Sequence, residues 1–401
     1  MTGVVVAKPL YRTVLPGTAM IAVTFGLARY GYGLLLPDMQ AELSISSGTA
    51  GLISSCTYVS YLLANVGVVW LTDRHGPRTA IGLAAALAVA GMVVLATAHS
   101  GAVLAVGVLV GGAAAGLAYP PYSDLVAGAV PAPRRDVAWS TISSGTGWGV
   151  ALAGPIAITA GGQWRIAWLV FVALAVSAGI MAVSFAPRRP RRLRRPQLSW
   201  TWFFCPRSRP LLLAAVLIGA GSAVWWTFCV DALRHAGIGP TTARVVYAVC
   251  GAAGIIASFS GAVLKGIGLR RGYLAACTLL AVSLALLGLV SAHLVAALGA
   301  AVLFGVFYVS VTAMQGIWSA RVFADHPAAG LTAVNVALTL GTLTGPALAG
   351  VSIARFGFPA TLVAAAVVIV AALPFCPPTA RRKRILDEHV CTAAPVEDDR
   401  T

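Results

Sequence analysis

Residues 71–98, LTDRHGPRTAIGLAAALAVAGMVVLATA, join a short charged loop to twenty residues without a charged side chain. An α-helix rises about 1.5 Å per residue, so twenty such residues cross the roughly 30 Å hydrocarbon core of a bilayer. The segment therefore predicts a transmembrane helix, residues 79–98, that begins directly after a charged loop.

Similar apolar stretches recur along the whole chain, which is 59% hydrophobic and only 10% charged. Soluble domains are about 25% charged, so this chain has too few charges to cover a surface that faces water. Barrel strands are shorter and alternate, which favours helices here. We predict an all-α membrane protein with twelve transmembrane helices. They are expected at residues 14–36, 48–71, 79–98, 102–125, 137–160, 166–185, 211–232, 243–264, 272–290, 294–318, 330–353 and 359–375.

The net charge of +16 is distributed unevenly between alternate loops. With the N-terminus in the cytoplasm, 23 of the 28 Lys and Arg side chains fall on the cytoplasmic side and 4 on the outside. The positive-inside rule then places both termini in the cytoplasm and the chain in the cytoplasmic membrane. Basic residues spread over loops, rather than over one soluble face, argue against nucleic-acid binding.

The loop 187–210 divides the chain into two halves of six predicted helices each, residues 1–186 and 211–376. Its eight arginines and several prolines predict an extended cytoplasmic linker with an aromatic membrane anchor at residues 200–204. The polar segment 377–401 is predicted to be a disordered cytoplasmic tail.

The two halves share landmarks at an offset of about 192 residues. Asp38 falls near Asp231, and the Gly-Pro pair at 154–155 falls near the pair at 345–346. Repeated six-helix halves are an architecture of secondary transporters, whose substrate path lies between the halves near the middle of the bilayer.

Several motifs resemble those of the major facilitator superfamily. The loop DRHGPR at 73–78 is similar to the family's D-R-x-G-R-[RK] signature, and both Gly-Pro pairs resemble its helix-5 motif. The segment WRIAW at 164–168 resembles the start of its sixth helix. FGLARYGYGLLLP at 25–37 resembles the first helix of a poorly characterised bacterial branch, A-R-[FY]-x-Y-G-x-L-x-P.

This resemblance implies two pseudo-symmetric six-helix bundles and secondary transport by alternating access. Pro77 departs from the signature, and Val108 stands where proton-coupled members often carry an arginine. The resemblance also implies a gating role for the loop and for the Gly-Pro pairs, the alternative for the loop being a solvated segment that only sets topology. The expected gating residues are Asp73, Arg74, Gly76, Arg78, Asp124, Gly154, Pro155, Gly345 and Pro346.

Arg29 is the one charged residue deep inside a predicted span. It lies roughly 22 Å from the start of its helix, past the midplane, where a charge costs several kcal/mol unless it faces a cavity or a partner. One interpretation is a site for an anionic or carbonyl-bearing substrate. The other is a side chain that extends outward to Asp38.

Polar and aromatic residues at helical spacing complete the predicted substrate site. Tyr58, Tyr61 and Asn65 lie on one face of a helix, which should avoid lipid; bonding between helices is the alternative. The predicted substrate-binding residues are Arg29, Tyr58, Tyr61, Asn65, Tyr119, Tyr122, Trp148, Trp225, Tyr308, Thr312 and Gln315.

These observations predict a secondary active transporter of a small organic solute, with an organic anion as one candidate. The alternatives are a drug or metabolite exporter that exchanges protons, and a receptor or scaffold that transports nothing. The expected partners are a small-molecule substrate and membrane lipids, with protons as a candidate coupling ion. We expect a monomer without cofactor, metal or enzymatic activity, because no catalytic or metal-binding motif is found.

The charge bias predicts the orientation of the loops. A reporter fused at Pro190 or at the C-terminus should be active in the cytoplasm, and one fused at Gly237 should be active outside. Activity of paired phosphatase and fluorescent-protein fusions measures this. The opposite pattern of fusion activities would contradict the twelve-helix topology.

Overall fold

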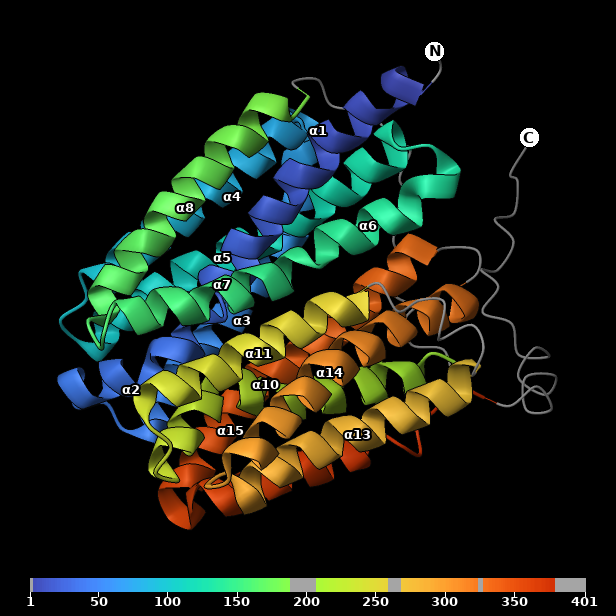
Figure 1. The fold of residues 1–401 in the computed structure, drawn as a ribbon. Coiled ribbons are helices and arrows are strands. Elements are labelled where there is room, and N and C mark those ends of the chain that lie inside the picture. Colours follow the sequence, from blue (N-terminus) through green and yellow to red (C-terminus); the bar gives the residue numbers. More distant parts are fainter. Residues whose placement is uncertain (1–2, 188–206, 259–267, 324–326, 379–401) are drawn as a thin grey trace, which may run out of the picture.

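The computed structural model describes residues 3–187, 207–258, 268–323 and 327–378, and its regular elements there are all helices (Figure 1). Most of the predicted linker 187–210, its aromatic segment and the tail 377–401 lie outside the described residues. The predicted domain boundaries there stay predictions.

The first half of the chain folds into ten helical elements of different lengths. They are α1 (Gly3–Ile21), η1 (Ala22–Leu27), α2 (Gly31–Leu43), α3 (Ser47–His75), α4 (Pro77–Ala96), α5 (Gly101–Ala129), η2 (Ala132–Arg134), α6 (Arg135–Ser143), α7 (Gly145–Thr159) and α8 (Trp164–Phe185).

The described helices of the second half are longer and fewer. They are α10 (Arg209–His235), α11 (Pro240–Ser258), α13 (Leu269–Val290), α14 (Leu294–Val322) and α15 (Pro327–Val370).

Ten described helices are long and apolar enough to cross a membrane. Two departures account for the difference from twelve. The predicted span 137–160 is divided into α6 and α7, and the last two predicted spans are joined in α15 across a kink at Gly357, whose φ is 78°. The described chain thus forms twelve transmembrane segments.

Several helices begin or end a few residues beyond their predicted limits. The side chain of Ser46 accepts a hydrogen bond from the backbone N–H of Thr49, so α3 begins at Ser47 rather than at residue 48. The predicted span 243–264 corresponds to α11 (Pro240–Ser258), beyond which residues 259–264 lie outside the described part.

The first predicted span, 14–36, is not one regular helix. Between α1 and α2 the chain forms the π-helical turn η1, in which the N–H of Ala28 bonds to the carbonyl of Val23 and that of Tyr30 to Phe25. This wide turn presses against α7, because a Cβ on Gly26 would lie 2.5 Å from the Cα of Gly149. Single π-turns in helices often mark functional sites.

The helices pack into two groups (Figure 1). In the first half α5 packs on α3 and α4, and α4 on α8; in the second α10 packs on α15, and α14 on α11 and α13. The groups meet mainly where α2 packs on α10, α3 on α15, and α7 on α11. We call the end of the molecule at which α2 ends the α2 end; α1 begins at the opposite end.

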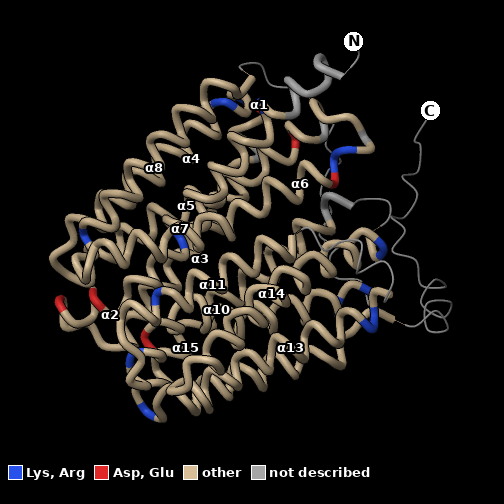
Figure 2. Tube along the Cα trace, in the orientation of Figure 1, with Lys and Arg blue, Asp and Glu red and all other residues tan. Residues whose placement is uncertain are grey.

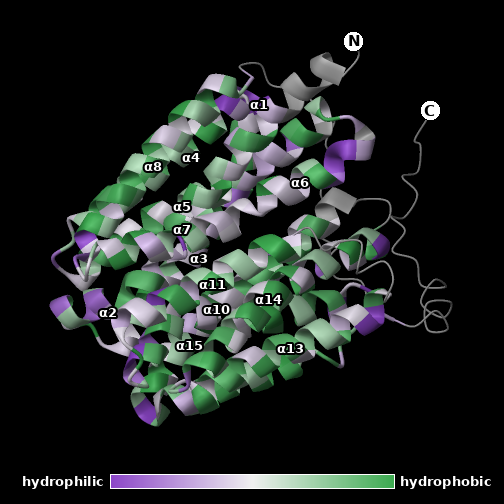
Figure 3. Cartoon of the chain, in the orientation of Figure 1, coloured by the Kyte–Doolittle hydropathy of each residue, from purple (hydrophilic) through white to green (hydrophobic). Residues whose placement is uncertain are grey.

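The outer surface matches a lipid environment. Most charged residues gather at the two ends of the helices, and apolar residues dominate their middles (Figures 2 and 3). Leu63, Ile180 and Leu348 lie within long apolar helices, and each is more than 65% exposed, as expected for side chains that face lipid.

Packing between α10 and α15 depends on a close backbone approach. A Cβ on Gly341 would lie 1.9 Å from the carbonyl oxygen of Val216. Gly341→Ala should therefore separate the helices and lower the free energy of unfolding by about 1–3 kcal/mol, a fall in melting temperature measurable in detergent. Gly299→Ala on α14, where no atom lies within 4 Å, is the matched control and should leave the melting temperature unchanged or higher.

Candidate functional site

Arg29 lies in the turn between η1 and α2 and is surrounded by four aromatic rings. Its guanidinium carbon is 4.5 Å from the ring centre of Tyr61, 4.6 Å from Tyr58, 5.3 Å from Phe25 and 5.4 Å from Tyr30. All four distances fall within the range of cation–π attraction. We call these four residues the aromatic cage.

Arg29 has no carboxylate partner among the described residues. Its Nε is buried without a hydrogen-bond partner there. The guanidinium is thus held among the rings and side-chain hydroxyls of Tyr58 and Tyr61, and no described carboxylate neutralises its charge.

Local sequence and helix geometry build the cage. Tyr58 and Tyr61 are three residues apart on α3 and therefore lie on one face. Phe25 comes from the π-turn η1. Both tyrosines of α3 were among the predicted substrate-binding residues. Phe25 and Tyr30 were not, although both stand close to Arg29 in its apolar segment.

The cage touches the second half of the chain. The ring of Tyr30 stacks on Trp226 of α10 at 4.2 Å, and the Tyr247 hydroxyl of α11 donates a 2.8 Å hydrogen bond to the Tyr30 carbonyl. Trp226 in turn contacts the ring of Tyr308 on α14 at 5.6 Å. Arg29 therefore lies beside the contact between the two halves.

Several predicted substrate residues belong to this continuous set. Arg29, Tyr58 and Tyr61 are in direct contact. Tyr119 joins through its edge contact with Phe25 at 5.0 Å, and Tyr308 joins through Trp226. The structure therefore brings together predicted residues from both halves of the chain.

The other candidates of the second half lie inside that half. Trp225 is buried and stacks at 4.4 Å on Phe304, whose ring also contacts Trp226. The Thr312 hydroxyl donates to carbonyls of its own helix. Gln315 is buried on α14 beside Tyr273 of α13.

The other candidates of the first half lie at increasing distance along the chain from the cage. Asn65 is half-buried one turn beyond Tyr61 on α3, and its side chain contacts that of Tyr61. Tyr122 packs against α1 at Gly17. Trp148 on α7 is 48% exposed.

The predicted gating loop lies at the end opposite α2. Gly76 adopts φ 86° between α3 and α4, a conformation that favours glycine. The charged candidates at this end are exposed or half-buried: Asp73, Arg74, Arg78 and Asp124. The Arg74 guanidinium lies 5.5 Å from the ring centre of Trp70.

Both Gly-Pro pairs lie where helices approach closely. A Cβ on Gly154 would be 2.5 Å from a side chain of α11, in the other half, while Pro155 is exposed. A Cβ on Gly51 would be 2.1 Å from the carbonyl oxygen of Pro346, again across the halves. Gly345 faces α10 within its own half.

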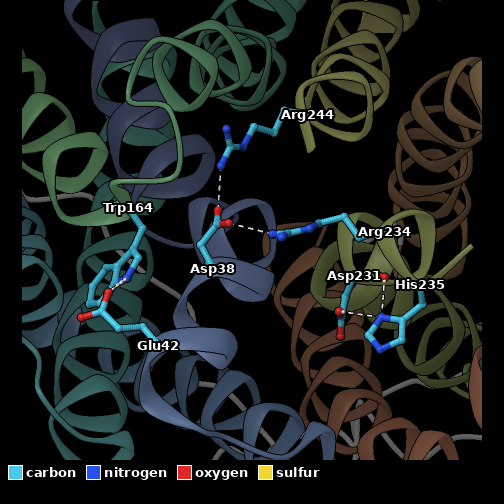
Figure 4. A network of polar contacts seen from close by, with 7 residues as sticks. All are labelled: Asp38, Glu42, Trp164, Asp231, Arg234, His235 and Arg244. Atoms are coloured by element: carbon cyan, nitrogen blue, oxygen red, sulfur yellow. Dashed lines mark hydrogen bonds and ion pairs between the residues drawn. The ribbon is translucent and has the colours of Figure 1, made fainter. Parts of the chain in front are cut away.

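A charged contact joins the two halves at the α2 end (Figure 4). Arg234 of α10 and Arg244 of α11 each donate a 2.7 Å hydrogen bond to a different carboxylate oxygen of Asp38 on α2. The Asp38 side chain is only 12% exposed and that of Arg244 4%. We call these three residues the α2-end latch.

The latch removes one interpretation of the sequence. Both oxygens of Asp38 are engaged by Arg234 and Arg244, so Asp38 is not the partner of Arg29. From the sequence, Arg234 and Arg244 are only two charges on outer loops, because the fold that brings them to Asp38 joins residues about 200 positions apart.

Glu42 forms a second, separate contact at this end. Its carboxylate accepts a 2.7 Å hydrogen bond from the indole N–H of Trp164 on α8 (Figure 4). It also accepts a hydrogen bond from Arg165, the next residue of α8. This contact lies entirely within the first half. Within the described ranges, no three His, Cys, Asp or Glu side chains are grouped so as to hold a metal ion.

The sequence profile described as Major Facilitator Superfamily matches residues 18–265, more than half of the chain. The chain belongs to the Major Facilitator Superfamily. It is accordingly a multi-pass membrane protein of a family of secondary transporters. A search of curated proteins found no match.

Solved structures of other transporters share the fold. The nucleoside transporter NupG, solved as a point mutant, superposes with a TM-score of 0.75 at 12% identity, covering 90% of this chain and 98% of that one. A bacterial homologue of the human lysosomal transporter Spinster, in an inward-facing and unoccupied conformation, gives 0.74 at 16% identity, covering 94% and 97%.

The latch should favour contact between the halves at the α2 end. Asp38→Asn removes the charge that both arginines bind, which should cost the closed arrangement about 2 kcal/mol and shift its population roughly thirtyfold. Spin labels on the exposed positions Ala41 of α2 and Thr241 of α11 measure the separation. Glu42→Gln is the matched control, and equal distance distributions for Asp38→Asn and the control would contradict the role of the latch.

Proposed function

We propose that the chain transports a small organic anion across the cytoplasmic membrane, and that a carboxylate or phosphate of the substrate pairs with Arg29. The observation that carries this proposal is the position of Arg29 in the aromatic cage, beside the contact between the halves and without a described carboxylate partner. The cage and its neighbours come from one chain, so a monomer suffices.

Energetics favour an anion as the missing partner. A cation–π contact is worth about 0.5–2 kcal/mol, whereas a cation within a membrane span costs at least a few kcal/mol. Ring faces therefore offset only part of the cost of Arg29. A charged oxygen bound by the planar guanidinium would complete the compensation and gain directional hydrogen bonds.

The cage also limits which anion fits. Phe25 and the three tyrosine rings offer apolar faces with one hydroxyl on each tyrosine, and Arg29 is the one cation in contact with them among the described residues. This composition suits a small organic molecule with one anionic group and an apolar body. A metal ion or a sugar would need more oxygen ligands or hydrogen-bond partners.

In an alternating-access cycle, the two halves would move so that Arg29 is open to one side of the membrane at a time. With the orientation expected from the loop charges, the α2 end faces outside and both termini face the cytoplasm. The closed latch then separates Arg29 from the outside, and rocking of the two halves would expose it there. The turn at Gly76 lies at the opposite end, where the resemblance places a second gate.

Substitutions of Arg29 test the substrate role. Arg29→Lys keeps the charge but loses the planar fork, so uptake of an anionic substrate should continue with about tenfold weaker apparent affinity. Arg29→Ala should abolish uptake and leave or raise the melting temperature, because a desolvated charge disappears. A panel of radiolabelled monocarboxylates and organic phosphates in membrane vesicles provides the uptake measurement.

The control for this series is Arg165→Lys. Arg165 is already paired with Glu42 at the α2 end, away from the cage, so its substitution should leave uptake unchanged. Normal uptake by Arg29→Ala would be sufficient to reject Arg29 as the substrate-binding cation.

A further inference from the structure

The last turn of α10 contains a buried carboxylate that the latch does not use. The side chain of Asp231 is 3% exposed, and its Oδ1 lies 3.1 Å from Nδ1 of His235 (Figure 4). Its Oδ2 has no hydrogen-bond partner among the described residues. Burying an ionised carboxylate with one unsatisfied oxygen costs folding free energy. The cost is much smaller when the carboxylate carries a proton and is neutral.

His235 connects this carboxylate to water. Its Nδ1 also lies 3.0 Å from the backbone carbonyl oxygen of Asp231. While Asp231 is ionised, both oxygens next to Nδ1, this carbonyl and the carboxylate Oδ1, can only accept a hydrogen bond. Nδ1 must then carry the hydrogen, which leaves Nε2 to exchange protons. The side chain is 63% exposed and its ring rests on Phe358 of α15 at 4.6 Å.

Charged and titratable groups stand on the helix of Asp231 and on three helices that pack against it. Arg234 and His235 share its own helix, and the cation of α15, Arg355, is exposed to solvent. The helices of the latch contribute Asp38 and Tyr32 from α2 and Arg244 from α11. Tyr32 donates its hydroxyl to the carbonyl of Ala50 at 3.1 Å.

Arg234 stands between two carboxylates of different halves. It is three residues from Asp231 on the same helix face, and it donates to Asp38 on α2. An ionised Asp231 attracts Arg234 toward its own half and competes with Asp38. A neutral Asp231 removes this competition and leaves Arg234 to the latch.

We propose that Asp231 and His235 form a proton-binding site that controls the α2-end latch, with proton uptake favouring the closed latch. A proton from water binds Nε2 of His235, and the hydrogen on Nδ1 passes to Oδ1 of Asp231. The imidazole returns to neutral as its other tautomer, and Asp231 ends as a neutral acid. No other bond changes.

This site sets the latch and does not carry protons across the membrane. His235 is exposed at the α2 end while the latch is closed, so the proton returns to the side from which it came. The inference rests on the proposed alternating access, in which the α2 end opens and closes. It makes the open fraction of that end depend on external pH.

Distance measurements on the purified full chain test the proposal without a substrate. Labels at Ala41 and Thr241, in a background whose native cysteines are replaced, report the separation of α2 from α11 between pH 5 and 8.5. Acidification should increase the short-distance population. Asp231→Asn, which mimics the neutral acid, should hold the short distance at every pH.

Two further variants keep the test decisive. His235→Gln should move the midpoint of the pH response to higher pH, because the ionised carboxylate loses the hydrogen bond that Nδ1–H of His235 donates to it. Glu42→Gln, which removes an acid from the same end but from a different contact, should reproduce the wild-type response. An unchanged midpoint in His235→Gln, or a wild-type response in Asp231→Asn, would overturn the proposal.

Asp38→Asn distinguishes failure of the proton site from failure of the latch. If it lengthens the distance at all pH values while the unsubstituted chain ignores pH, the proton site is wrong and the latch stands. If it leaves the distance unchanged, the latch itself is wrong, and with it this part of the proposed transport cycle. Uptake by the Arg29 variants is independent of both results.

Discussion

Backbone-to-backbone packing at glycine holds this protein together. Lipid tails are as apolar as the helices, so burial of apolar area drives helices together only weakly in a membrane, and close contact must supply the attraction. The contacts are very close between the halves: a Cβ on Gly33 would lie 1.9 Å from the carbonyl oxygen of Trp226, and one on Gly350 would lie 2.3 Å from that of Ser47. Such contacts need no side-chain rearrangement to separate, which suits surfaces that must part during transport.

Against this apolar packing, charge is used sparingly and at defined depths. The ion pairs at the α2 end join Asp38 to two arginines across the halves and Glu42 to Arg165 within one half. Arg29 alone among the cations of the described membrane interior rests on aromatic faces. The protein therefore separates two tasks, since paired charges hold helices together and a cation without a carboxylate partner remains available to a ligand.

The sequence predicts the transmembrane segments well because lipid imposes a simple rule: about twenty residues without charge. It also predicts that Arg29, Tyr58 and Tyr61 matter together, since a buried charge and a polar helix face both need an explanation. It does not predict the division of 137–160 at Gly145 or the π-turn at 22–27, because both depend on which helix lies alongside. The latch was missed for a similar reason, as Asp38 and Arg244 meet only after the two halves have docked.

The π-turn has a consequence for the register of the first membrane segment. A π-turn accommodates one extra residue, and each residue of an α-helix turns the chain by about 100°. All of α2 is therefore rotated relative to the position that a regular helix continuing α1 would give it. Because of this rotation, α1 presents one face to its own half, while α2 presents Gly33 and Asp38 to the other half. Loss of a single residue from 22–27 would rewind the helix and turn that face away, although every contacting side chain of α2 would still be present.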